Sequence, residues 1–365
     1  MNAARLSVLL ALALAACLSS EPSHAADAEA LYGAGVDGKV GFIDKTGKMV
    51  IAPQFVDLNP WVFTGKLCGV MTGGLWGFID RSGTIIIEPQ FAEIWDFEDG
   101  MALVRTTTGK GGYLDESGKM VIAAQYDGAR LFSEGLAPVQ TGEQWGYIDK
   151  TGATVIAPQF ADAFRFYEGL AAVKVGGKWG YIDKTGTVVI PARFTEAHRF
   201  TEGRGPVKID RKSGYIDNSG QVIVPLQYSD LCDFSEGLAC VKLGGKWGFI
   251  DKDGQMVVPA KYAQVMNFSE ERARVKLGGK WGFIDKTGTL VVPARFESAN
   301  RFSEGVAAVK TGGKWGYVDK SGQIVVPAQY SETVMFLEGL ALVRTRDKAE
   351  YIDKSGNVVW SGSLK

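Results

Sequence analysis

The chain has 365 residues, of which 46% are apolar, and its 40 Lys and Arg residues nearly balance its 41 Asp and Glu residues. This balance provides no basic surface for a nucleic-acid backbone, so we expect no nucleic-acid partner. The apolar content is ample for a continuous core, which excludes an intrinsically disordered chain.

Residues 1–25 have the features of an export signal. Arg5 precedes an apolar run at residues 6–16 that is too short to span a bilayer comfortably. The run ends at Cys17 in Leu-Ala-Ala-Cys, which resembles the bacterial lipobox, where cleavage leaves the cysteine as the lipid-bearing first residue. Ser-His-Ala at residues 23–25 is instead typical of an ordinary signal cleavage site, which would release a soluble protein. Both routes predict export, to the periplasm or to the cell envelope. A membrane anchor, the lipid on Cys17, is expected only from the first route.

A repeat fills the rest of the chain, residues 26–365, which we therefore expect to form one domain. Its marker is an aspartate that recurs at spacings of 36, 35 and then 34 residues: Asp44, Asp80, Asp115, Asp149, Asp183, Asp217, Asp251, Asp285, Asp319 and Asp353. A period this strict indicates a repeat array, in which each unit buries its apolar face against its neighbours.

One copy, Leu170–Gly203, shows what the repeat encodes. Residues 170–175, 178–182 and 188–190 read as strands separated by two tight turns. Gly176-Gly177 suits a two-residue hairpin with positive φ at both positions. Asp183-Lys-Thr-Gly186 has the Asp-first, Gly-fourth pattern of a type I turn. We therefore predict a three-stranded antiparallel meander in each of about ten repeats, and an all-β fold.

Alternation along the second strand places Trp179 on one face and Gly180 on the other. The third strand is apolar on both faces, so we expect it to be buried on both sides between neighbouring sheets. Pro191 should end this strand, because proline cannot donate to a β-ladder.

The motif Gly-Lys-Trp-Gly-Phe/Tyr-Ile-Asp-Lys-x-Gly, followed by an apolar strand, a proline, an aromatic and Phe-x-Glu-Gly, resembles the bacterial WG or KWG repeat. The resemblance covers about residues 30–360 and includes six Trp-Gly pairs: Trp76-Gly77, Trp145-Gly146, Trp179-Gly180, Trp247-Gly248, Trp281-Gly282 and Trp315-Gly316. It implies β-repeat modules of exported or interaction-related bacterial proteins, and it implies no single biochemical activity.

Four copies depart from this pattern, with Val40, Gly111, Ser213 and Ala349 in place of the tryptophan. The first and last suit a capping role, since terminal units face solvent on one side. Gly111 and Ser213 lie inside the array, where each substitution could open a cavity, fit a local distortion or mark a binding notch. Neutral drift is the simplest account of both.

The chain offers few residues for catalysis. His198 is the sole histidine outside residues 1–25, and it lies at a variable connector position. The repeated turn aspartate supplies one carboxylate per copy, too few for a calcium site, and is expected to cap its turn. A second row begins with Glu134 and recurs through Glu338; we expect a turn role, a hydrogen bond to the connector, or pairing with lysines such as Lys178. We predict a non-enzymatic protein without catalytic residues, metal or cofactor.

Three cysteines lie beyond Cys17. A disulfide between Cys232 and Cys240 is conceivable after export, because the interval spans one connection between strands. Cys68 and Cys240 fall near positions held by Ala, Pro or Leu in other copies, which favours small buried thiols.

These features predict a scaffold whose stacked repeats bind another protein. The alternative is binding of glycans or cell-wall polymer through Trp61, Trp95 and Trp360, which lie outside the usual tryptophan position. For the architecture we favour an open superhelical solenoid over a closed propeller, because ten units exceed the four to eight blades typical of propellers. A ring would require the segment near Leu31 to lie beside Val358-Val359.

Overall fold

The computed structural model describes residues 29–363, which form strands and turns without a helix. No helix able to cross a membrane is found within this range. The strands form eight four-stranded antiparallel sheets and one of seven strands. We call each four-stranded unit a blade; the seven-stranded sheet holds two blades that share β8 (Ile85–Glu98), so that ten blades follow one another along the chain. The tandem all-β array is therefore confirmed.

The three expected strands are present in every blade. The first strands are β1 (Leu31–Val36), β6 (Leu67–Thr72), β9 (Met101–Thr106), β13 (Leu136–Thr141), β17 (Ala171–Val175), β21 (Gly205–Ile209), β25 (Leu238–Leu243), β29 (Ala273–Leu277), β33 (Val306–Thr311) and β37 (Ala341–Arg344). The second strands are β2 (Lys39–Ile43), β7 (Leu75–Asp80), β10 (Gly111–Asp115), β14 (Gln144–Asp149), β18 (Lys178–Ile182), β22 (Lys212–Ile216), β26 (Lys246–Asp251), β30 (Lys280–Ile284), β34 (Lys314–Asp319) and β38 (Lys348–Ile352).

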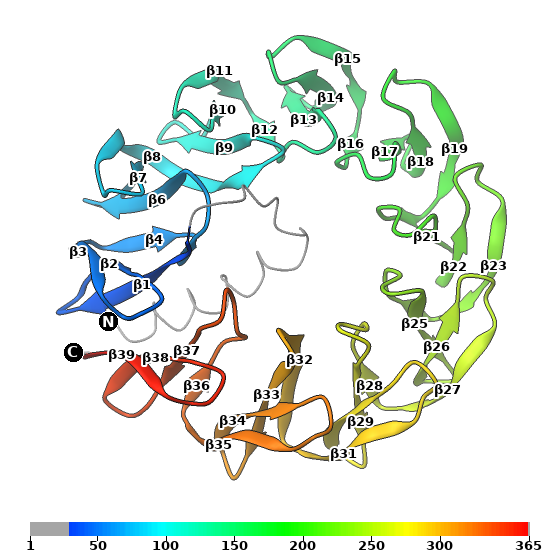
Figure 1. Cartoon of the computed structure of the whole chain (residues 1–365). Coiled ribbons are helices and arrows are strands. Elements are labelled where there is room, and N and C mark those ends of the chain that lie inside the picture. Colours follow the sequence, from blue (N-terminus) through cyan, green and yellow to red (C-terminus); the bar gives the residue numbers. More distant parts are fainter. Residues whose placement is uncertain (1–28, 364–365) are drawn as a thin grey trace.

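The third strands are β3 (Met49–Phe55), β8, β11 (Met120–Tyr126), β15 (Thr154–Phe160), β19 (Val188–Phe194), β23 (Val222–Tyr228), β27 (Met256–Tyr262), β31 (Leu290–Phe296), β35 (Ile324–Tyr330) and β39 (Val358–Ser363). The connector adds a short fourth strand that pairs with the first: β4 (Asp57–Asn59), β5 (Val62–Phe63), β12 (Gly128–Ala129), β16 (Asp162–Ala163), β20 (Glu196–Ala197), β24 (Asp230–Leu231), β28 (Gln264–Val265), β32 (Ser298–Ser303) and β36 (Glu332–Thr333). In Figure 1 the connector strands face the central hole and the third strands lie on the outer circumference.

Both predicted turns are confirmed. Gly176 and Gly177 have φ angles of 57° and 79°, as a primed hairpin turn requires. The Gly186 amide donates a 3.0 Å hydrogen bond to the Asp183 carbonyl oxygen, and Gly186 has φ of 86°. The sequence therefore fixes the two tightest points of each blade locally.

The glycine of the Trp-Gly pair lies beneath a β-bulge. Trp179 pairs with Phe194 and Tyr181 pairs with Ile190, so that three residues of β19 face Gly180 alone. A Cβ atom on Gly180 would lie 2.5 Å from the Ile190 carbonyl oxygen, which no side chain tolerates. Pro191 lies inside this bulge and the strand continues past it, so the prediction that proline ends the strand was wrong. A bulge needs no ladder donor at that point.

The third strand is an edge, not a buried strand. Val188 is 59% exposed, whereas Ile190 is 1% exposed. The predicted burial on both faces was therefore wrong: neighbouring blades cover the sheet near the hole, and the outermost strand reaches solvent.

The core lies between consecutive blades. One apolar cluster joins Trp179, Tyr181 and Ile190 of the fifth blade to Phe200 and Val207 of the sixth. The buried Tyr181 hydroxyl donates a 2.8 Å hydrogen bond to a carbonyl oxygen of the sixth blade, that of His198. This seam is thus held by packing and by a hydrogen bond from a buried phenol.

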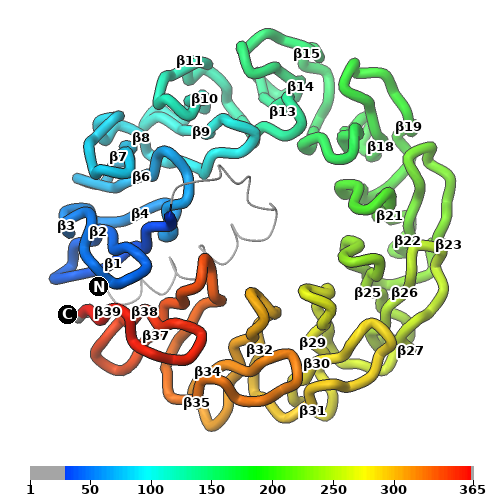
Figure 2. The backbone as a smooth tube through the Cα atoms, viewed as in Figure 1, coloured from blue at the N-terminus to red at the C-terminus, as the bar shows by residue number. Residues whose placement is uncertain are grey.

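The array follows a circular path that brings its two ends together (Figures 1 and 2). Tyr32 and Ile43 of the first blade pack in one apolar cluster with Leu340 and Tyr351 of the last. The Tyr32 hydroxyl also donates a hydrogen bond of 2.6 Å to the Glu338 carbonyl oxygen. The sheets remain separate units and none closes into a barrel, as in the expected stack, but the first and last blades are in contact.

Candidate functional site

The repeated aspartates cap their turns. Asp183 Oδ1 accepts hydrogen bonds from the Thr185 amide at 2.9 Å, the Thr185 hydroxyl at 2.6 Å and the Thr187 amide at 3.0 Å. The hydroxyl bond is the main cause that holds the pKa of this carboxyl below its usual value. All lone pairs of this oxygen are engaged within the turn. In the described part of the chain, no group of three or more His, Cys, Asp or Glu residues could hold a metal ion.

The repeated glutamates from Glu134 to Glu304 each connect their blade to the next. Glu168 has φ of 52° in a two-residue turn, and its carboxylate accepts a 2.8 Å hydrogen bond from the Gly203 amide in the following copy. Glu134 also forms an ion pair of 3.0 Å with Lys184. The turn role and the connector hydrogen bond expected from the sequence are therefore both present, and the lysine partner is the one in the aspartate turn.

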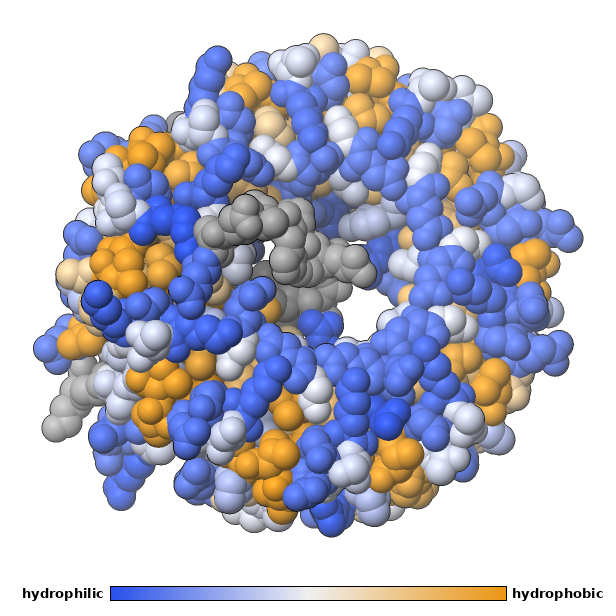
Figure 3. All heavy atoms as spheres, in the orientation of Figure 1, coloured by the Kyte–Doolittle hydropathy of each residue, from blue (hydrophilic) through white to orange (hydrophobic). Residues whose placement is uncertain are grey.

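An apolar rim runs along the outer circumference. We define it as the exposed apolar residues at the start of the third strand in all ten blades: Val50, Ile85, Ile86, Met120, Val155, Val188, Val189, Val222, Met256, Val257, Leu290, Ile324 and Val358. Figure 3 shows separate apolar patches around the ring. In the described chain the outer backbone edge of these strands has no strand partner, except in β8. The rim was not predicted from the sequence, although all but two of these strands contain a proline, which is a signal of an edge strand.

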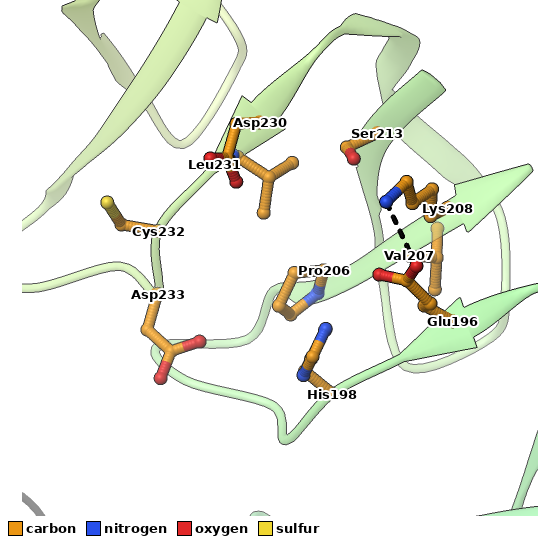
Figure 4. Close-up of a pocket in the computed structure, with 10 residues that line it drawn as sticks. All are labelled: Glu196, His198, Pro206, Val207, Lys208, Ser213, Asp230, Leu231, Cys232 and Asp233. Atoms are coloured by element: carbon orange, nitrogen blue, oxygen red, sulfur yellow. Dashed lines mark hydrogen bonds and ion pairs between the residues drawn. The ribbon is translucent and has the colours of Figure 1, made fainter. Parts of the chain in front are cut away.

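A cavity of about 280 Å³ lies between the sixth and seventh blades, where Ser213 replaces the usual tryptophan. Ser213 pairs with Lys208 and Tyr228, as Trp179 pairs with Lys174 and Phe194 in the preceding blade. The missing indole therefore leaves its space partly empty. In Figure 4, His198, Pro206 and Leu231 lie around this space, with the Lys208 and Glu196 ion pair beside them.

Gly111, which also replaces a repeat tryptophan inside the array, lies close to the next blade instead. A Cβ atom on Gly111 would lie 2.9 Å from the Ala129 Cβ atom of the next blade, so the two strands approach closely there. A second cavity of about 250 Å³, lined by Trp95, Leu103 and Arg130 among others, lies near this seam. Of the accounts that the sequence left open, a cavity suits Ser213, and a local distortion, here the close approach of two blades, suits Gly111.

His198 lines the first cavity together with Ser213 and Asp233. These residue types could suggest nucleophilic catalysis, but Asp233 accepts a 2.9 Å hydrogen bond from Arg199, and within the described residues no hydrogen bond joins the three side chains. The arrangement offers recognition chemistry: a cation, carboxylates, an imidazole and apolar walls.

Cys232, which also lines this cavity, is joined to Cys240 by a disulfide with a Cα to Cα distance of 5.2 Å. The two residues face each other across β24 and β25, where the Cys232 amide donates to the Cys240 carbonyl oxygen at 3.0 Å. The sequence favoured free thiols here, and the direct pairing explains why a bridge forms instead. Cys68 is a free, buried thiol.

The three tryptophans considered for glycan binding lie apart in the fold and are all partly buried. Trp61 packs on the apolar cluster of the first two blades, and Trp95 packs on that of the third and fourth. Trp360 packs on the cluster that joins the last blade to the first, which we call the closing seam. No single surface gathers them. Cys17 and the cleavage sites of residues 1–25 lie outside the described residues, so the structure does not bear on lipidation.

Nine tandem segments of the chain match the model of the family described as "WG containing repeat": residues 41–76, 76–107, 112–145, 145–179, 179–212, 214–247, 247–281, 281–315 and 315–348. A comparison with curated proteins gave no match.

Among solved structures, a eukaryotic initiation factor is similar with a TM-score of 0.53 and 11% identity, over 92% of this chain and 96% of that one. The computationally designed Ika8 protein has a TM-score of 0.40 and 13% identity over 74% and 95% of the two chains. BamB from Moraxella catarrhalis has a TM-score of 0.39 and 15% identity over 68% and 88%. Only the first likeness is strong enough to support the fold, and it supports nothing beyond the fold.

Proposed function

The chain belongs to the family of WG containing repeats, and from this premise we propose that it is a non-enzymatic, exported scaffold that binds another protein along its apolar rim. The rim is the observation that carries the proposal. Exposed apolar surface that repeats at one structural position differs from the scattered single residues that are normal on a protein surface. Here it recurs in all ten blades, so a partner that follows the circumference would bury a similar contact at each step.

Two features support export to the periplasm or the cell envelope. The disulfide between Cys232 and Cys240 suits an oxidising compartment. The apolar run before Cys17 supplies a signal for export, with attachment through a lipid on that cysteine as one outcome. Glycan binding is the weaker alternative, because its three candidate rings are engaged in apolar packing.

Site-specific photo-crosslinking in the native cell tests the proposal. A photoreactive phenylalanine analogue replaces Val188, Val222 or Leu290 on the rim, and Val175 serves as the control because it is 48% exposed but lies at a hairpin end. We expect the rim positions to capture one common protein that Val175 does not capture. Purified partner should then bind the wild-type chain and lose affinity for a Val188→Lys, Val222→Lys variant. Equal capture from Val175, or unchanged affinity of the lysine variant, would overturn the proposal.

A further inference from the structure

We propose that the cavity beside Ser213 is a binding site for one planar aromatic ring of the indole class. The inference does not depend on the scaffold function. The cavity is lined by residues of the connector strands β20 and β24 (Figure 4), whereas the rim lies on the third strands at the outer circumference (Figure 1).

The other blades show what this space holds when it is full. In the fifth, seventh, eighth and ninth blades a lysine ammonium lies 5.5 to 5.9 Å from the centre of the indole directly opposite it, as Lys174 does from Trp179. Such a cation over a ring face is an attractive contact. Lys208 keeps this position opposite Ser213 without a ring beneath it, and its ammonium pairs instead with Glu196 at 2.9 Å.

His198 supplies the second contact. Its place in the repeat is taken by Phe164 in the fifth blade, whose ring stacks on Trp179 at 4.8 Å with an angle of 9° between the planes. In the fourth blade the same place is taken by Arg130, whose guanidinium lies 4.7 Å from the Trp145 ring centre. A flat group at this position therefore covers the indole where one is present. His198 keeps a flat group there and lines the cavity.

The remaining walls suit a ring that carries an N–H group. Pro206, Val207 and Leu231 provide apolar contact, and the carboxylates of Asp230 and Asp233 lie at the same cavity. Leu231 occupies a position held by Ala197 in the preceding blade, and so fills part of the space. The volume of about 280 Å³ that remains is at the small end of ligand sites and suits a single ring system.

The ring could belong to a free small molecule or to a tryptophan side chain of another protein. The probes are therefore indole, N-acetyl-tryptophanamide and a short peptide with a central tryptophan. Binding is followed by the NMR signals of the imidazole of His198, which a His198→Ala variant identifies. We expect a saturable shift with indole. Binding of indole without the peptide assigns the site to free molecules, and binding of the peptide as well assigns it to a protein side chain.

Filling the cavity provides the decisive control. Ser213→Trp with Leu231→Ala restores the pair of Trp179 and Ala197 found at the seam between the fifth and sixth blades, and should abolish the shift. Leu231→Trp should abolish the shift by filling the cavity from the opposite wall. By calorimetry, His198→Ala should weaken indole binding by about twofold to tenfold, the usual range for an aromatic stacking contact. Met266→Ala, at the equivalent place two blades further on, should leave affinity unchanged. Absence of a shift with indole, or an equal shift in the filled variants, would overturn the proposal.

Discussion

The Tyr351 hydroxyl in the last blade donates a hydrogen bond of 2.9 Å to the Gly33 carbonyl oxygen in the first. Tyr181 makes the same contact to His198 across an interior seam at 2.8 Å. The closing seam also repeats the edge-to-face aromatic pair, with Tyr351 and Tyr32 at 5.5 Å where the interior has Tyr181 and Phe200 at 5.1 Å. The ends of the chain therefore meet through the same kinds of contact that join the fifth and sixth blades.

Tyr351→Phe should destabilise the protein by about 1 to 3 kcal/mol, because it leaves the buried Gly33 carbonyl oxygen without its donor. Denaturant unfolding measures the loss. Tyr181→Phe is the matched interior variant and should cost a similar amount. A loss at Tyr181 with none at Tyr351 would show that the ends do not hold together in solution.

Asp96 should make the protein less stable as pH rises from about 4 to 6. Burial, with a smaller contribution from the Glu98 carboxylate, raises the pKa of Asp96 to about 6 from 3.8, and its buried Oδ1 has no hydrogen-bond partner. The raised value means that the stabilising contribution is full below pH 3.8 and is lost as pH rises through the folded pKa. Asp96→Asn should add about 1 to 3 kcal/mol near neutral pH and remove this slope. A variant whose stability runs parallel to wild type across that range would contradict the assignment.

The turn aspartates should have the opposite effect on stability, which they should lower as pH falls. Hydrogen bonds, foremost that from Thr185, lower the pKa of Asp183, and the same holds for Asp149 and Asp217 with their own hydroxyl partners. Their contribution is present above pH 3.8 and is lost as pH falls through the lowered values. A triple Asp→Asn variant at these positions keeps an acceptor but no titrating group. Its unfolding midpoint should change less than that of wild type between about pH 4 and pH 2, and an unchanged acid profile would count against the prediction.

Replacing Ser213 or Gly111 by the tryptophan of the other repeats should change the stability of the protein in opposite directions. Ser213→Trp with Leu231→Ala fills a cavity and should stabilise the protein by about 1 to 3 kcal/mol. Gly111→Trp should destabilise it by at least about 1 to 3 kcal/mol, since even a Cβ atom there would lie 2.9 Å from Ala129. Thermal unfolding of both variants tests the contrast, which the same sign of effect in both would refute.

The sequence predicted what local chemistry decides. The glycine pair at Gly176, the capped turn at Asp183 and the three-stranded meander all follow from residues next to one another. The fourth strand could not be predicted, because two residues such as Glu196 and Ala197 pair only after the blade has formed. The circular path depends on a small rotation repeated at each seam, and no single residue encodes that sum.

The candidate sites, too, could be predicted from the sequence only in part. Ser213 was visible as an exception to a pattern, yet only the structure distinguishes the cavity there from the close approach at Gly111. The rim escaped prediction because an apolar third strand has the same composition whether neighbours cover it or solvent reaches it.

A linear stack loses structure first at its two outer units, each of which has only one neighbour. In this molecule the first blade packs against the tenth through Tyr32 and Tyr351, so every blade has two neighbours. Melting must then begin by breaking two seams at once, and we expect a sharp, all-or-none transition in place of gradual fraying.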